Sequence, residues 1–187
     1  MSGRVFAVVG PSGAGKDRLL AGAVAADPRL HWARRVITRA ARPDDEPHET
    51  VTPGGFARRQ AAGEFALHWS AHGLDYGIPE AEFAGLALGR DVIFNGSRAA
   101  LPQALARFPS LAVLVITAPD DVLAARIAAR GRETSPDRHA RLVRQVPDLP
   151  AGLRHWRIVN DTTPEAGIAR LCAALDQARA ATEFPAS

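Results

Sequence analysis

The sequence predicts an α/β fold with a parallel core sheet, and three observations support this prediction. Short apolar stretches such as residues 111–116 lack polar alternation, as expected for strands that are covered on both faces. These stretches alternate along the chain with segments of helical periodicity. The first of them, residues 5–9, leads through a glycine-rich loop directly into an apolar helical segment. The 187 residues therefore suit one compact domain of alternating strands and helices.

The expected elements follow one another in a regular order. Strands are predicted near 4–9, 31–37, 91–95, 111–117 and 155–160, and helices at 16–26, 98–107, 120–131, 137–146 and 164–181. Prolines and glycines divide the remaining region, 38–90, into short pieces. Such an insertion between core strands is a usual place for a mobile substrate-binding subdomain, and we expect the acceptor site there.

The composition favours a soluble cytoplasmic protein. Hydrophobic residues make up 47% of the chain, but no uninterrupted apolar run approaches the twenty or so residues that a membrane helix needs. The first strand begins almost at once, which leaves no room for a signal peptide. Cys172 is the only cysteine, so an internal disulfide is excluded and a reducing compartment is expected.

The charge pattern argues against a nucleic-acid partner. The formal net charge is only +3, and the 6% of aromatic residues are scattered rather than interleaved with a basic stripe. The arginines instead gather in small clusters, such as Arg34 with Arg35 and Arg39 with Arg42. Clusters of this size suit small phosphorylated ligands. The sequence makes no prediction of oligomeric state.

Lys16 is the only lysine among the 23 Lys and Arg residues of the chain. It closes a loop with the spacing of a phosphate-binding loop, Gly10-Pro11-Ser12-Gly13-Ala14-Gly15-Lys16. Backbone N–H groups and the following helix N-terminus would cradle phosphates there. A compact ammonium reaches the β- and γ-phosphates as a point charge, whereas a planar guanidinium is too wide. The alternative is a glycine-rich turn that binds no ligand.

Asp17 stands where such loops normally carry the Ser or Thr hydroxyl that meets Mg²⁺. A carboxylate is also a hard oxygen ligand, so it could hold the metal directly or through water. Alternatively, Asp17 stabilises the helix N-terminus by its charge. The two possibilities are compatible with each other, and both remain open.

Several further motifs resemble the guanylate kinase-like P-loop kinases over roughly residues 4–175. They are the loop 10–16, Thr38-Arg39 with Arg42-Pro43, Gly63 with Phe65, Tyr76-Gly77, Arg126 with Arg130-Gly131 and Glu133, and Val159-Asn160-Asp161. Within that group, residues 69–79 and 95–98 resemble the ribose 1,5-bisphosphate phosphokinases. Those enzymes convert ribose 1,5-bisphosphate and ATP into phosphoribosyl diphosphate and ADP.

The resemblance implies a P-loop three-layer sandwich with three functional parts. These are a core of residues 1–37 and 91–181, an acceptor-binding subdomain at about 38–90 and a lid at about 131–146. The implied small-molecule substrates are ATP, with Mg²⁺, and ribose 1,5-bisphosphate.

The resemblance also implies roles for individual residues. The implied ATP site is residues 10–17 with Asn160, the acceptor site is Arg39, Arg42, His48, Tyr76, Asn95 and Ser97, and the catalytic residues are Lys16, Arg126, Arg130 and Arg141. On spacing alone, Arg126 and Arg130 are also consistent with a solvated helix face, and Asn160-Asp161 with a helix cap.

Two departures from guanylate kinases argue against a guanine acceptor. Leu67 falls where those enzymes carry the guanine-reading Glu, and Ile78 falls where they carry a Thr or Ser. Two aliphatic side chains cannot pair with the polar edge of a base.

A further departure from guanylate kinases concerns the metal. Asn95 replaces an Asp that lies near the metal in those enzymes, and Asp17 could restore that lost negative charge.

Two other functions stay open at this point. The nearer one is a nucleoside monophosphate kinase, which would consume ATP with a purine or pyrimidine monophosphate. The more distant one is an inactive guanylate kinase-like interaction module. Such a module is expected to have lost its phosphate-binding loop, and Lys16 argues against it.

Overall fold

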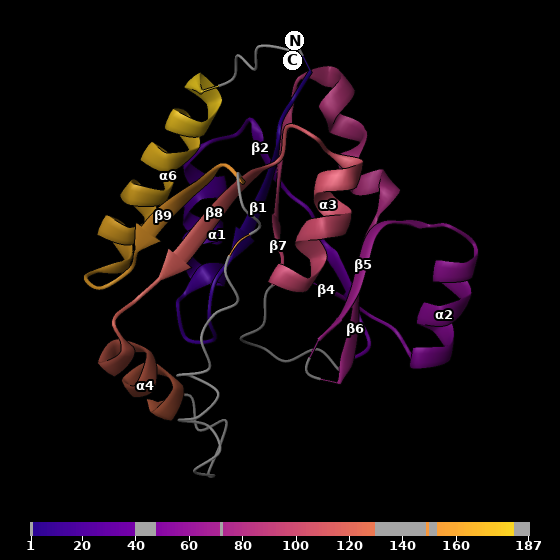
Figure 1. The fold of residues 1–187 in the computed structure, drawn as a ribbon, viewed down its shortest axis with the longest axis horizontal. Coiled ribbons are helices and arrows are strands. Elements are labelled where there is room, and N and C mark those ends of the chain that lie inside the picture. The colour runs from indigo at the N-terminus through magenta and orange to yellow at the C-terminus, as the bar shows by residue number, and fades with distance from the viewer. Residues whose placement is uncertain (1, 40–47, 72, 130–148, 150–152, 182–187) are drawn as a thin grey trace. The chain divides into compact units, whose positions relative to one another are not determined.

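A computed structural model describes residues 2–39, 48–71, 73–129, 149 and 153–181 (Figure 1). The chain separates into two compact units. Unit 1 comprises Met1–Ala7 and Asp27–Leu111, and unit 2 comprises Val8–Ala26 and Ala112–Ser187. Strand β1 (Val5–Val9) therefore contributes residues to both units. All five of its side chains are buried, as predicted for a central strand.

The predicted parallel core sheet is confirmed. Its strand order is β2-β7-β1-β8-β9. β2 (Leu30–Trp32) pairs in parallel with β7 (Asp91–Asn95), and β8 (Ala112–Thr117) pairs in parallel with β9 (His155–Val159). The chain crosses from strand to parallel strand through helices, which gives an α/β fold.

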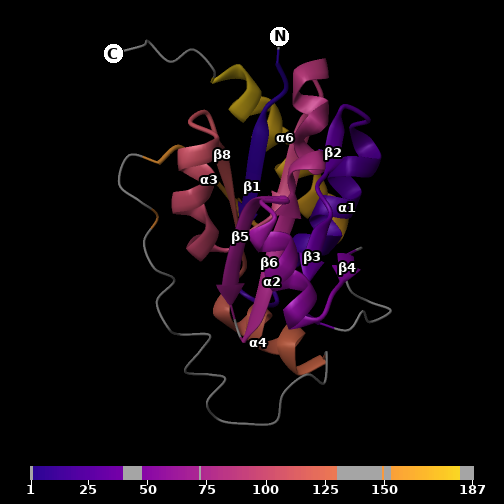
Figure 2. The same cartoon turned by 90° about the vertical axis from the view of Figure 1, so that its right-hand side faces the viewer.

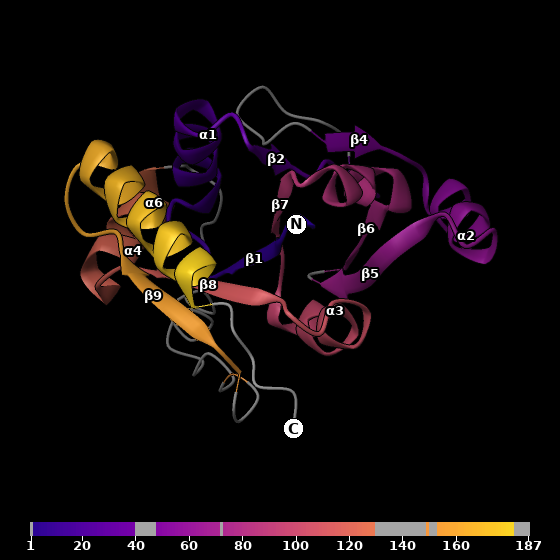
Figure 3. The same ribbon diagram turned by 90° about the horizontal axis from the view of Figure 1, so that it is seen from above.

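In unit 2, two helices lie side by side and one of them covers the strands. Helix α1 (Lys16–Ala26) packs along α6 (Pro164–Ala180), and α6 packs on β8 and β9 (Figures 1 and 3). The N-cap of α6 is Thr163, whose Oγ1 accepts a hydrogen bond from the Ala166 amide at 3.3 Å. α4 (Asp120–Ala129) follows β8. The predicted helix at 137–146 and the predicted lid fall outside the described residues.

Unit 1 contains a second sheet, formed mainly within the predicted insertion. Its order is β4 (His48–Thr50), β3 (Arg35–Ile37), β6 (Leu74–Pro79) and β5 (Phe65–Ala71), and Figure 2 shows these strands side by side. β6 is antiparallel to both β3 and β5, whereas β3 and β4 are parallel. The sequence predicted short pieces here but no sheet.

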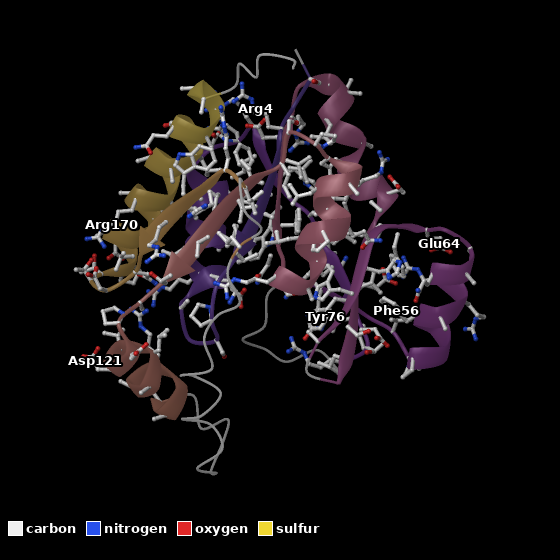
Figure 4. The ribbon with its side chains drawn as sticks, viewed as in Figure 1. Arg4, Phe56, Glu64, Tyr76, Asp121 and Arg170 are labelled. Atoms are coloured by element: carbon white, nitrogen blue, oxygen red, sulfur yellow. The ribbon has the colours of Figure 1, made fainter. Side chains whose placement is uncertain are left out.

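Helix α2 (Pro53–Ala61) covers one face of the second sheet. Its Phe56 stacks on Phe65 of β5, with ring centroids 4.8 Å apart, and both belong to a buried cluster with Val36 of β3 (Figure 4). Burying a side chain of this size stabilises the fold by about 1.5–3 kcal/mol. The cluster therefore fixes α2 and leaves the other face of the sheet for other contacts.

The predicted strand at 31–37 is wrong as a single element. It consists of β2 and β3, which belong to different sheets. The Ala33 amide still donates to the Ile93 carbonyl (2.9 Å), but the Arg34 amide donates to the Glu82 carboxylate (2.9 Å). Because a side chain satisfies that amide, the backbone can leave the first sheet there and join the second.

The remaining elements of unit 1 include two 3₁₀ segments and one α-helix. η1 (Glu80–Leu88) precedes β7, and η2 (Arg98–Ala100) leads into α3 (Leu101–Arg107). The predicted helix 98–107 is therefore α-helical only from Leu101, where Pro102 occupies the first turn. No helix within the described ranges combines the length and apolar character that crossing a bilayer requires.

Candidate active site

The loop between β1 and α1 has the geometry of a phosphate cradle. A Cβ atom at Gly10 would lie 2.0 Å from the Ile116 carbonyl oxygen, so only glycine lets the chain pass β8 at this point. Gly15 has φ +84°, and a Cβ there would lie 2.6 Å from the Asn160 side-chain nitrogen. Its carbonyl then accepts the Leu19 amide at 3.1 Å, which starts α1 directly behind the loop. A helix N-terminus behind a glycine-rich turn favours an anion.

The Lys16 ammonium is held against its own loop. Nζ donates hydrogen bonds to the carbonyls of Gly10 (2.8 Å) and Pro11 (2.9 Å), and the side chain is half-buried. These two bonds fix the single positive charge beside the turn where backbone amides would meet phosphates. A guanidinium is a wider, planar group, and it could not be held by the same pair of carbonyls without moving the loop.

Asn160, the residue directly after β9, connects the end of this strand to the loop. Its Nδ2 donates to the Ala14 carbonyl at 2.8 Å, and its backbone carbonyl accepts a hydrogen bond from Arg126 Nη1 at 3.0 Å. The residue is 6% exposed. Its Oδ1 is buried without a hydrogen-bond partner among the described residues. Asn160 is therefore placed to support the loop.

A cavity of about 290 Å³ opens beside these groups. It is lined by Gly13, Gly15, Arg18, Leu19, Arg126, Ala129, Asn160 and Pro164. Ligand pockets of this kind combine mostly apolar walls with a few polar groups that orient the ligand. Because it adjoins the phosphate loop, the cavity suits the base or ribose of a nucleotide.

An ion pair secures the segment after β9. Arg170 on α6 donates to the Asp161 carboxylate (2.7 Å) and to the Val159 carbonyl, and Figure 4 shows Arg170 on that helix. The hydrogen bond from Arg170 is the main cause that holds the pKa of Asp161 below its usual value. The helix cap is Thr163 rather than Asn160 or Asp161, so the capping interpretation of those two residues is wrong.

Asp17 lies in the first turn of α1 and is half-buried. A carboxylate there is favourable next to the positive end of the helix. No cluster of three or more His, Cys, Asp or Glu residues suitable for a metal occurs in the part of the chain that the structure describes. Mg²⁺ does not need such a cluster, since one carboxylate, nucleotide phosphates and water commonly complete its octahedron. Asp17 therefore fits an ion that is held mainly by a bound nucleotide.

In unit 1, the two positions that would read a guanine base belong to the core. Leu67 of β5 pairs with Ile78 of β6, and both side chains are 0% exposed. A β-bulge between Phe65 and Leu67 shifts the register, which puts Phe65 on the α2 face and Leu67 on the opposite face. Two fully buried aliphatic side chains offer a ligand no polar contact.

The other predicted acceptor residues of unit 1 lie on several elements. Tyr76 is on β6, His48 opens β4, Arg39 follows β3, and Asn95 ends β7. Tyr76, His48 and Asn95 are buried, and Arg39 is half-buried. Ser97 precedes η2, and its Oγ is buried with no hydrogen-bond partner among the described residues. An unsatisfied buried hydroxyl is unusual, and a bound ligand, an ion or an ordered water can satisfy it.

Comparison with known proteins identifies the family. The ribose 1,5-bisphosphate phosphokinase PhnN of Ruegeria sp. is 47% identical over 161 residues, which cover 86% of this chain and 84% of that protein. The chain belongs to the ribose 1,5-bisphosphate phosphokinase family. The bifunctional ribose 1,5-bisphosphokinase-thymidine phosphorylase of Cupriavidus necator is also 47% identical, over 100% of this chain. The chain spans only 31% of that protein's length. No family model matches the chain.

A solved structure confirms the fold. The crystal structure of guanylate kinase from Anaplasma phagocytophilum has a TM-score of 0.71, covers 97% of this chain and 88% of its own, and is 19% identical. The predicted guanylate kinase-like P-loop fold is therefore confirmed. At this identity the likeness concerns the fold alone.

The structure gathers part of the predicted site of this family member. In unit 2 it brings together the loop 10–16, Arg126 and Asn160. Arg42, Arg130 and Arg141 fall outside the described residues. The division into core, acceptor subdomain and lid remains a prediction, as do the roles of the individual site residues.

Sequence reasoning missed the contacts of Arg35 and Trp69. Both lie against the ring of Tyr76, at 5.2 Å for the Arg35 guanidinium carbon and 5.4 Å for the Trp69 ring centroid. Arg35 appeared only as a member of a basic cluster. The contact between Arg35 and Tyr76 depends on the register in which β3 and β6 pair, and a local sequence motif does not predict that register.

Proposed function

We propose that the protein transfers the γ-phosphoryl group of ATP to ribose 1,5-bisphosphate. The bond between the γ-phosphorus and the β–γ bridging oxygen breaks, and an oxygen of the C1 phosphate forms a new phosphoanhydride bond. The products are 5-phospho-α-D-ribose 1-diphosphate and ADP. Membership of the family supports this activity, which the relatives' names state for those proteins. The phosphorylase named for the bifunctional relatives is not part of the proposal.

The donor groups of the proposal belong to unit 2. Lys16 and the amides of the loop would hold the ATP phosphates, and the neighbouring cavity would take the nucleoside. Arg126 is half-buried and hydrogen-bonded to the Asn160 carbonyl, which sets its guanidinium beside that cavity. Phosphoryl transfer depends mainly on positioning and on offsetting charge, so fixed cations of this kind suit the reaction.

We further propose that Asp17 contributes to a site for Mg²⁺ that forms with the bound nucleotide. When bound, Mg²⁺ would offset the negative charge of the phosphates. The carboxylate of Asp17 supplies the negative charge that Asn95 lacks, because an amide is neutral. Asp17 stands next to Lys16, so the carboxylate and the ammonium both belong to the start of α1.

One observation gives the strongest support to a sugar bisphosphate as acceptor: the two positions that would read a base are buried. Leu67 and Ile78 are fully buried, so the described surface of unit 1 offers no polar group at these positions for a guanine edge. A site that must recognise a base needs such groups, because an unpaired polar edge loses much of its binding energy. A sugar carrying phosphates makes no such demand. Its hydroxyls could instead meet the unpaired Ser97 hydroxyl and the neighbouring Asn95.

No strong general base is required for this reaction. The attacking group is a phosphate oxygen, and a phosphate monoester loses its second proton near neutral pH. The difficulty is instead the repulsion between two anions, which arginines and a metal ion offset.

The test is identification of the product. The purified protein is incubated with ATP, MgCl₂ and ribose 1,5-bisphosphate, and the products are followed by ³¹P NMR and mass spectrometry. We expect ADP and the 1-diphosphate in equal amounts, and neither with Lys16→Ala. Release of ADP with inorganic phosphate, or ADP formation with GMP but not with the sugar bisphosphate, would overturn the proposal.

A further inference from the structure

One face of the second sheet gathers five side chains from its four strands. Tyr76 on β6 pairs with Ile37 on β3 and with Trp69 on β5, and Arg35 on β3 pairs with His48 on β4. Side chains of paired residues share a face, and residues two apart on one strand share it too. His48, Arg35, Ile37, Tyr76 and Trp69 therefore form one surface, which we call the acceptor face.

Arg35 and Trp69 hold the Tyr76 ring between them. The Trp69 ring stacks on Tyr76 at 5.4 Å with only 5° between the planes, and the Arg35 guanidinium carbon lies 5.2 Å from the Tyr76 centroid. β3 and β5 flank β6 on opposite sides, so the two contacts reach the ring from opposite neighbours. Tyr76 and Trp69 are buried, whereas Arg35 is half-buried. The ring thus gives the guanidinium a fixed support while part of Arg35 still reaches solvent.

The proposed acceptor requires two separate cationic groups. It carries one phosphate that is phosphorylated and a second, at C5, that only binds. The family resemblance gives Arg39, Arg42 and Tyr76 to the first phosphate. Leu67 and Ile78 lie on the same side of the sheet, but they carry no charge and are fully buried. A supported guanidinium is well suited to the second phosphate, because its N–H edge binds oxyanions in a fixed geometry while its flat face stacks.

We propose that Arg35 binds the phosphate of the acceptor that is not phosphorylated, and so selects a sugar bisphosphate. This inference rests on the proposed function. Arg35 lies on β3, whereas Arg39 lies in the bend that follows this strand, so four residues of chain separate them and their Cα atoms are at most about 13 Å apart. Two guanidinium groups on different parts of the chain can each bind one end of a ligand that carries two phosphates. Arg35 thereby becomes a specificity-determining residue, with Trp69 and Tyr76 as its support.

The experiment uses two ligands that each keep one phosphate. Ribose 5-phosphate retains the group assigned to Arg35, and ribose 1-phosphate retains the reacting group. Binding of each is measured by isothermal titration calorimetry with the wild type, Arg35→Gln and Arg35→Lys. We expect Arg35→Gln to weaken ribose 5-phosphate roughly tenfold to a hundredfold, as for the loss of a charged hydrogen bond, and to leave ribose 1-phosphate unchanged. The affinity of Arg35→Lys for ribose 5-phosphate should lie between those of the wild type and Arg35→Gln.

A matched control separates this role from loss of a cation–π contact. Arg107 on α3 lies over Phe108 at 5.4 Å and is exposed, so Arg107→Gln removes a comparable contact elsewhere in unit 1. We expect it to change neither affinity. With ribose 1,5-bisphosphate, Arg35→Gln should raise KM by the same tenfold to hundredfold that it weakens ribose 5-phosphate, with KM for ATP unchanged.

Other outcomes overturn the inference in distinguishable ways. Weaker binding of ribose 1-phosphate alone would make Arg35 a positioning residue that acts through Tyr76. Unchanged binding of both ligands would remove Arg35 from the site while leaving the proposed function intact. A wild type that fails to phosphorylate ribose 1,5-bisphosphate would overturn both. If thermal unfolding shows that Arg35→Gln is not folded, Arg35→Lys carries the same comparison.

Discussion

The nucleotide loop and the acceptor face are built in opposite ways. The loop is one continuous stretch, residues 10–17, whose shape depends on backbone geometry and on contacts such as Lys16 to the Gly10 and Pro11 carbonyls. The acceptor face takes single side chains from four strands that register brings together. A backbone-built site admits few substitutions, whereas a face of side chains can change its ligand while the sheet stays the same. We therefore propose that the donor loop tolerates little substitution and that the acceptor face sets the specificity.

The largest effect should come from the loop, because its geometry permits no substitute for Lys16. We expect Lys16→Arg to lower kcat at least about a hundredfold, or about 2.7 kcal/mol of barrier, although the charge is kept. Steady-state assays with ribose 1,5-bisphosphate, alongside the unfolding midpoint, measure this. The charge-conserving control is Arg29→Lys at the exposed Asp27 pair, which should change nothing. Retention of more than about a tenth of wild-type kcat would contradict the point-charge argument.

A second substitution tests whether Leu67, one of the two buried base-reading positions of unit 1, belongs to the hydrophobic core. We expect Leu67→Glu to lower the free energy of unfolding by about 3 kcal/mol or more, because it buries a carboxylate without a partner. The same exchange at Leu88, which is 83% exposed, should stay within about 0.5 kcal/mol. Urea denaturation followed by circular dichroism compares the two variants. A fully stable Leu67→Glu protein that phosphorylates GMP would show that this position is open to ligands.

Substitutions of Asn160 test whether its side chain alone supports the phosphate-binding loop. Asn160→Ala leaves the Ala14 carbonyl unpaired, so we expect a loss of about 1–3 kcal/mol in stability and a higher KM for ATP. Asn160→Asp should raise KM further, since a carboxylate cannot donate to a carbonyl. Gln103→Ala removes a comparable bond, to the His68 amide in unit 1, and should leave KM for ATP unchanged. Equal KM values for the Ala and Asp variants would argue against the hydrogen bond.

The smallest effect concerns the metal. Asp17→Asn should shift the Mg²⁺ titration of activity to higher concentration, if the carboxylate holds the ion directly or through water. Asp121→Asn is the matched control, because Asp121 also lies in the first turn of a helix, α4 (Figure 4). An Mg²⁺ titration that moves equally little in both variants would leave Asp17 with a helix-stabilising role alone.

The sequence predicted the backbone-built region better than the side-chain-built one. The loop 10–16, β1 and α1 follow from local spacing and periodicity, and the parallel core sheet follows from unalternated apolar runs. The second sheet was missed because its strands β3 and β4 are only three residues long and its partners lie far apart in the chain. The break between β2 and β3 depends on Glu82, about fifty residues away, which no local pattern can report.

The site residues divide in the same way. Lys16 could be singled out as the only lysine of the chain. Arg35 could not, because its contact with Tyr76 depends on which strands pair and in which register. The support that Asn160 gives to Ala14 likewise joins residues at opposite ends of the sequence.

The most direct test of the account measures kcat/KM for ribose 1,5-bisphosphate and for GMP with the unmodified protein, in the same buffer with saturating ATP and MgCl₂. Because the positions that would read a base are closed and apolar, we predict that the sugar bisphosphate is preferred by about 10⁴-fold or more. Comparable values for the two acceptors would contradict the claim that unit 1 selects two phosphates and no base.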